Sequence, residues 1–127
     1  MVVSTNAPTF AQGQLEVLAG LEDEGGDLIP QIVNMFVADT DRSLAKATDA
    51  VSHDNLSTLR WIVHDLIGSC GTIGAGRMRA LAGEIELTLA RGQLQAVDAS
   101  VRMLVEEYGR VRALLGEYAS SHAHPLS

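Results

Sequence analysis

One apolar pattern near the carboxyl end constrains the fold more than any other feature of the sequence. Seven apolar residues between positions 97 and 118 follow one another at intervals of four, three, four, three, four and three residues. They are Val97, Val101, Leu104, Tyr108, Val111, Leu115 and Tyr118. This spacing places all seven on one face of an α-helix. Because a helix with one apolar face has to bury it, the chain needs partner helices of comparable length.

Further amphipathic segments precede this helix, separated by glycine and by Asp or Asn residues. We predict a short helix at about 12–22 and long helices at about 27–50, 55–72 and 75–91. Asp27 is a suitable N-cap, Pro30 falls in the first turn, where its missing N–H costs little, and Gly92 suits the C′ position after the helix at 75–91. The side chains expected to face the core are Leu28, Ile32, Met35, Phe36, Leu44 and Ala47 in the helix at 27–50, and Met78, Leu81, Ala82, Ile85 and Leu89 in the helix at 75–91.

Four long amphipathic helices with short connections predict an all-α fold, an up-down-up-down antiparallel four-helix bundle. The additional short N-terminal helix would pack over one end. No segment alternates with a period of two residues, so we expect no sheet. The 127 residues fit a single domain, with a globular part at about 12–119 and frayed ends. Since one bundle uses every apolar face we find, we expect a monomer.

Charge and composition exclude several functional classes. The formal net charge is −7, and the nine Lys and Arg residues are scattered, so no basic patch for nucleic acid is visible. No apolar run reaches the roughly 18 residues of a membrane span, and the N-terminus does not resemble a signal peptide. The single cysteine, Cys70, cannot form an internal disulfide. These features lead us to expect a cytoplasmic protein with no membrane or nucleic-acid partner.

The segment HDLIGSCGTIGA, at 64–75, combines an outward histidine with a glycine one turn later. On a helical wheel the buried stripe comprises Leu56, Leu59, Ile62, Val63, Leu66, Cys70 and Ile73. His64 lies about 140° from the centre of this stripe and therefore faces solvent. Gly68 costs roughly 1 kcal/mol relative to alanine in a helix interior. Because helical side chains lean toward the N-terminus, a side chain at position 68 would cover the imidazole, which glycine leaves accessible. A tolerated glycine beside an ordinary surface histidine is the alternative.

The same residues resemble a known family pattern. The histidine-containing phosphotransfer (HPt) domains of phosphorelays carry roughly H-x-L-K-G-S-x-x-x-x-G-A, followed by a helix with an L-E or similar pair. This chain has HDLIGS at 64–69, then Gly74-Ala75 and, in the next helix, Ile85-Glu86. Upstream, EGGDLIPQIVNMFVADT at 24–40 resembles the entrance to the family's second helix. The resemblance covers about residues 13–118.

The resemblance implies a phosphoryl carrier rather than an enzyme. The neutral imidazole of His64 would attack the aspartyl phosphate of a response-regulator receiver domain and later pass the group to another receiver. The receiver would supply the acceptor carboxylate and Mg²⁺, so the chain would need no cofactor of its own; a hybrid sensor histidine kinase is a further expected partner. Glu86 would orient His64 by accepting a hydrogen bond from Nδ1–H. Ser69 would contact the phosphoryl group or bond to its own backbone.

One position departs from the family pattern. Where the family usually has lysine, three residues after the histidine, this chain has Ile67. Arg60, one turn before His64, could supply the missing charge. We expect Trp61, Ile67 and Gly71 to contribute docking surface, with burial of Trp61 under the short first helix as the alternative. The missing lysine motivates a second hypothesis, a phosphorylation-independent adaptor or inhibitor that docks receiver domains.

Other chemistries fit the sequence less well. The dimerisation helices of sensor kinases continue their histidine box with a basic residue and proline, whereas Ile67-Gly68 follows here and no ATP-binding domain is present. Cys70 falls on the buried stripe and His64 does not, so these two residues cannot share a metal. The Glu-x-x-His pairs of di-metal bundles are absent from the sequence. We therefore expect no metal site.

Overall fold

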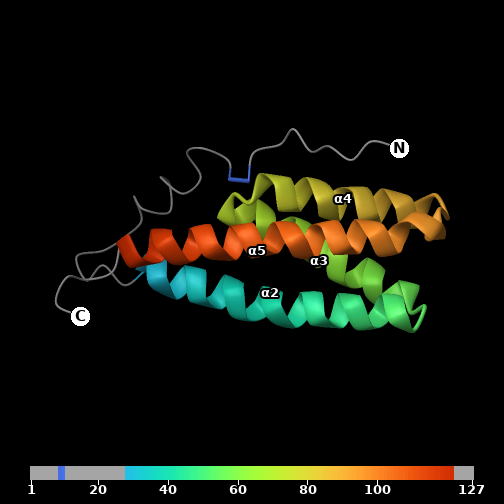
Figure 1. The fold of residues 1–127 in the computed structure, drawn as a ribbon, viewed down its shortest axis with the longest axis horizontal. Helices are drawn as coiled ribbons and strands as arrows, with labels where there is room; N and C mark the ends of the chain where they lie inside the picture. Colours follow the sequence, from blue (N-terminus) through green and yellow to red (C-terminus); the bar gives the residue numbers. More distant parts are fainter. Residues whose placement is uncertain (1–8, 11–27, 122–127) are drawn as a thin grey trace.

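Four long helices lie side by side in the computed structural model, which describes residues 9–10 and 28–121. They are α2 (Leu28–Ser52), α3 (Leu56–Ile73), α4 (Gly76–Ala90) and α5 (Val97–Ser121), with a short 3₁₀ turn, η1 (Leu94–Ala96), before α5. Each helix packs against the next, and α5 also packs against α2, in front of α3 in Figure 1. Short connections reverse the chain, which confirms the predicted up-down-up-down antiparallel bundle. The helix predicted at 12–22 and the Asp27 cap lie outside the described residues.

The helix ends follow from local backbone chemistry. Asn55 caps α3, and its side-chain oxygen accepts a hydrogen bond from the Thr58 N–H at 3.4 Å. At the other end Gly74 adopts φ = 83° and donates its N–H to the Cys70 carbonyl at 2.9 Å. This left-handed conformation suits glycine and reverses the chain. Ala75, the next residue, is fully buried, so the Gly-Ala pair of the motif combines a permissive backbone with a small packed side chain.

The core is almost entirely aliphatic, as the composition indicates. Six of the seven residues predicted for the α5 face are buried, and Tyr118 is partly buried. The prediction that Met35 faces inward is wrong, because its side chain is 67% exposed. The buried face of α2 instead consists of Ile29, Val33, Phe36, Thr40, Leu44, Ala47 and Ala50. Met35 is rotated by about 100° from Phe36, which places it outside this stripe.

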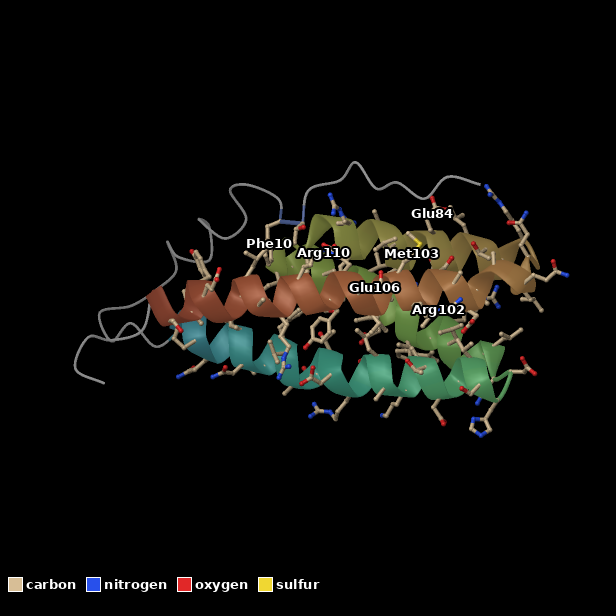
Figure 2. The ribbon with its side chains drawn as sticks, in the orientation of Figure 1. Phe10, Glu84, Arg102, Met103, Glu106 and Arg110 are labelled. Atoms are coloured by element: carbon tan, nitrogen blue, oxygen red, sulfur yellow. The ribbon has the colours of Figure 1, made fainter. Side chains whose placement is uncertain are left out.

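Charged and polar residues cover the outward faces, and one carboxylate is buried. Figure 2 shows Arg102, Glu106 and Arg110 along the outer side of α5. Glu107 is only 1% exposed, and it lies 3.3 Å from Arg110 Nε and 3.8 Å from Arg77 of α4. Tyr108 fastens α5 to α2 by donating its hydroxyl to Asp41 at 2.6 Å. Within the described ranges, no helix combines the length and the apolarity that crossing a membrane requires.

Candidate functional site

His64 projects from the outer face of α3 and is held at one ring nitrogen by α4. Its side chain is 75% exposed, as the wheel predicts. Nδ1 lies 2.9 Å from Oε2 of Glu86, and the Glu86 side chain is 37% exposed. An ionised carboxylate can only accept hydrogen bonds, so Nδ1 is the protonated nitrogen in this pair. Nε2 therefore carries the free lone pair, and it has no hydrogen-bond partner in the described part of the chain.

The register of α3 and α4 creates this pair. The two helices run antiparallel from the turn at Gly74, so the residue at 86 comes opposite the residue at 64. Leu66 and Ile85 are buried beside them in the shared core, which fixes the rotation of each helix. The carboxylate consequently reaches the imidazole from the neighbouring helix rather than from α3 itself.

Gly68 leaves open space one turn beyond the histidine. A Cβ atom built on Gly68 would meet no neighbouring atom within 4 Å, and the residue is exposed. The glycine is therefore not required by packing inside the protein. A side chain at 68 would lean toward His64. Its absence therefore keeps the imidazole accessible to a molecule that approaches from solvent.

A shallow open pocket surrounds the histidine. It is lined by Ser57, Arg60, Trp61, His64 and Glu86. Trp61 is 71% exposed. The short first helix, which was its predicted alternative cover, lies outside the described residues. Ser57 was not predicted as part of the site, although it stands seven residues before His64 and hence on the same face. This seven-residue spacing could have identified Ser57 from the sequence.

Two other predicted site residues, Ser69 and Ile67, make contacts within the protein itself. The Ser69 hydroxyl donates to the Leu66 carbonyl at 3.3 Å, so it bonds back to its own helix, one of the two predicted alternatives. Ile67 is partly buried and packs against the core, which leaves only part of its side chain for a docking surface. No positive charge is therefore present at the family's lysine position.

Arg79 is a residue near the site that was not predicted. It extends from α4 across α3, so that a Cβ built on Gly71 would lie 3.5 Å from its Nε. Gly71 provides the space for this side chain, and its predicted docking role stays a prediction. The position of Arg79 on a neighbouring helix left no signal in the local motif around His64.

Two further titratable groups, Cys70 and Tyr108, have pKa values that packing shifts. Burial raises the pKa of the Cys70 thiol to about 12, with the Arg79 charge acting weakly in the opposite direction. Burial and the hydrogen bond to Asp41 raise the pKa of Tyr108 above its ordinary value. In the described residues, no three His, Cys, Asp or Glu side chains gather closely enough to hold a metal ion.

Comparison with known proteins identifies the family. Residues 31–118 match the Hpt domain family. The phosphorelay protein LuxU of Vibrio cholerae serotype O1 is 26% identical over 95 residues, which cover 75% of this chain and 82% of LuxU. Histidine-containing phosphotransfer protein B (HptB) from Pseudomonas aeruginosa PAO1 has the same fold, with a TM-score of 0.82 and 23% identity over 90% of this chain and 96% of that chain.

A plant protein extends the structural likeness. The histidine-containing phosphotransfer protein MtHPt2 from Medicago truncatula has a TM-score of 0.77 and 20% identity, over 90% of this chain and 79% of that chain. The two solved structures agree with the bundle, and the family match spans most of the chain, α3 and α4 included. The chain therefore belongs to the Hpt domain family, the histidine phosphotransfer proteins of phosphorelays.

Proposed function

We propose that His64 is the phosphoacceptor, and that it takes a phosphoryl group from the aspartyl phosphate of one receiver domain and passes it to another. The observation that carries this proposal is the 2.9 Å contact between Nδ1 and Glu86, combined with the exposure of the imidazole. This contact leaves the lone pair on Nε2, the ring nitrogen that has no partner in the described part of the chain. The membership of the Hpt family supports the assignment.

The transfer step then needs few groups from this chain. Nε2 donates its lone pair to phosphorus, and the bond between phosphorus and the aspartyl oxygen breaks, with its electrons leaving on the carboxylate. The imidazole gains positive charge as the N–P bond forms. Glu86 stabilises that charge because its carboxylate faces Nδ1–H, and it also keeps the ring in the reactive tautomer. Transfer to a second receiver is the reverse reaction.

The partner supplies what this surface does not contain. Phosphoryl transfer depends on positioning and on neutralising charge. We propose that the receiver domain contributes the acceptor aspartate and the Mg²⁺ that neutralises the phosphoryl oxygens. The chain contributes the nucleophile, the orienting carboxylate and the open approach above Gly68. Trp61 and the exposed part of Ile67 would form apolar docking surface, with Arg60 and Gly71 beside them.

Incubation with a phosphorylated receiver domain and Mg²⁺ tests the proposal. We expect acid-labile label to move from the receiver to this chain, and the His64→Gln variant to accept none. Since His64 is 75% exposed, this substitution should leave helical circular dichroism and melting nearly unchanged. Label that persists in His64→Gln would contradict the assignment.

His53 provides a matched control within the same chain. Its side chain is 71% exposed, and Nδ1 lies 3.4 Å from the Asp49 carboxylate, so it also pairs an accessible imidazole with an acid. However, Nδ1 also lies 2.9 Å from the Asp49 carbonyl at the end of its own helix. We expect His53→Gln to accept label at the normal rate.

The adaptor hypothesis makes a different prediction in the same experiment. Its motive is Ile67, because the family's usual lysine is absent. Tight binding of the receiver with no movement of label would favour an adaptor or inhibitor over a carrier. We further propose that the chain acts as a monomer in the cytoplasm, with a hybrid kinase as the upstream source of the phosphoryl group.

A further inference from the structure

We infer that Arg79 is a docking residue that binds a carboxylate on the receiver domain. The inference rests on the proposed function, since it assigns a role at the same site. The guanidinium group lies over Gly71, and the distance from Nε to a Cβ built on that glycine would be 3.5 Å. The Arg79 charge also lowers the pKa of Cys70, which agrees with a position close to this part of α3.

The register of the two helices puts Arg79 on the same face as His64. Gly71 follows His64 by seven residues on α3, and Arg79 precedes Glu86 by seven residues on α4. Seven residues are nearly two helical turns, so each pair shares a helix face to within about 20°. Because the helices are antiparallel, the contact of Arg79 with Gly71 repeats the contact of Glu86 with His64, about 10 Å further along the bundle.

Between these two contacts the surface is depressed, because two glycines there have no side chain. Gly68 on α3 and Gly83 on α4 lie in this interval, and a Cβ built on either would meet no neighbouring atom within 4 Å. A partner that reaches His64 can therefore also approach the side chain of Arg79. At about 10 Å from the imidazole, Arg79 is a contact for the docked protein rather than for the phosphoryl group.

The pairing of the arginines indicates which are available for a partner. Five arginines lie within 4 Å of a carboxylate in the described residues, namely Arg42, Arg77, Arg102, Arg110 and Arg112. Arg60, Arg79 and Arg91 have no such partner in that part of the chain. Of these three, Arg60 and Arg79 border the His64 face, one from each side along the bundle axis. Both cations are free to pair with an incoming protein.

The chemistry of the proposed partner complements this arrangement. A receiver domain that carries an aspartyl phosphate and binds Mg²⁺ presents carboxylates around the reacting group, because Mg²⁺ takes oxygen ligands. The chain itself has a formal net charge of −7 and would repel such a surface at long range. Unpaired arginines on the docking face oppose this repulsion locally. They should affect mainly the association rate and its salt dependence.

The test compares Arg79→Gln with Arg102→Gln. Arg102 pairs with Asp98 on α5, on the outer side shown in Figure 2, so it is a control for loss of one positive charge. The donor is the phosphorylated receiver domain that transfers fastest to the wild-type chain in a purified panel. At low salt we expect Arg79→Gln to lower the second-order transfer rate roughly 3- to 10-fold, and Arg79→Lys to retain most of it. The difference should shrink as salt rises.

Phosphoramidate provides the readout that separates docking from chemistry. This small donor transfers its phosphoryl group to histidine and releases ammonia without any docked protein. We expect equal labelling of His64 by phosphoramidate in the wild-type chain, Arg79→Gln and Arg102→Gln. If Arg79→Gln slows both donors equally, or slows neither, the docking assignment is wrong.

If the proposed function is wrong, the same experiments should give a different result. A receiver that binds but transfers no label would refute phosphotransfer while leaving docking measurable. The fluorescence of Trp61, the only tryptophan, reports such binding when the receiver has no tryptophan. In that case a 3- to 10-fold weaker affinity of Arg79→Gln would support the docking assignment, and an unchanged affinity would overturn it.

Discussion

Replacement of Gly68 by glutamine should strengthen the fold and block the function at the same time. Glycine in a helix interior is about 0.8–1.0 kcal/mol less favourable than alanine, and glutamine is among the better helix formers. A Cβ at position 68 meets no neighbouring atom within 4 Å, so no steric cost offsets this gain. We expect Gly68→Gln to stabilise the bundle by about 0.5 kcal/mol. For a domain of this size the melting temperature should rise by about 2 °C.

The effect on transfer has the opposite sign. The glutamine side chain would lean toward the N-terminus of α3 and cover the imidazole of His64. A receiver would then hold its phosphorus atom well outside the distance for attack by Nε2. Because misplacement by about 1 Å can cost 100-fold, we expect a fall in the transfer rate of roughly 100-fold or more. The assay is label transfer from a phosphorylated receiver, combined with thermal unfolding followed by circular dichroism.

Gly109 supplies the matched control. It lies inside α5 and is exposed, and a Cβ built on it would also meet no neighbouring atom within 4 Å. Gly109→Gln should raise the melting temperature by a similar amount and leave transfer unchanged. Normal transfer by Gly68→Gln would refute the steric account of this glycine. A lower melting temperature of Gly68→Gln would refute the claim that a side chain at position 68 has no steric cost.

Three further predictions concern single side chains. Glu86→Ala should slow transfer roughly 10- to 100-fold and shift the ¹⁵N resonances of His64 toward those of a tautomer mixture. Glu86→Gln keeps a hydrogen-bond acceptor, so its transfer rate should fall less. Glu107→Met should leave the free energy of unfolding in urea unchanged or raise it by up to about 2 kcal/mol, because the buried carboxylate makes no hydrogen bond in the described residues. Its ion-pair partners Arg77 and Arg110 are partly exposed and stay in contact with water without it. A loss above about 1 kcal/mol would contradict this prediction. Since burial raises the pKa of Cys70 from 9.0 to about 12, its contribution to stability is complete below pH 9 and is lost as pH rises toward 12. Between pH 9 and 11 the wild-type chain should therefore lose more stability than Cys70→Ala, and parallel curves would exclude this role of the thiol.

Features that depend on the spacing of residues along a single helix could be predicted from the sequence. The spacing between Val97 and Tyr118 identified the inner face of α5, and the wheel of α3 placed His64 outside the core. Both results follow because helical geometry fixes the direction of each side chain relative to its neighbours. In α2 the same reasoning failed at Met35, since apolar residues on adjacent positions allow two stripes, and packing with α3 and α5 selects the one that includes Thr40.

Contacts between helices depend on register, which spacing within one helix does not determine. The position of Glu86 opposite His64 was implied by the family resemblance and not by the wheel of α3. Likewise, Glu107 stands next to Tyr108 on the buried side of α5, where Arg110 of the same helix and Arg77 of α4 both lie within 4 Å of its carboxylate; the contact with Arg77 depends on the register of α4 and α5. The contact of Arg79 with Gly71 depends on the same antiparallel register that pairs Glu86 with His64.

That shared register links the nucleophile to the docking surface. A shift of α4 along α3 by one turn would move Glu86 away from Nδ1 and, by the same distance, move Arg79 away from Gly71. The turn at Gly74-Ala75 opposes such a shift, because Gly74 occupies a left-handed conformation and Ala75 is fully buried. A bulkier residue at 75 should therefore weaken His64 orientation and receiver docking together, although it lies more than two turns from the imidazole. Independent loss of only one of the two would show that they do not depend on a common register.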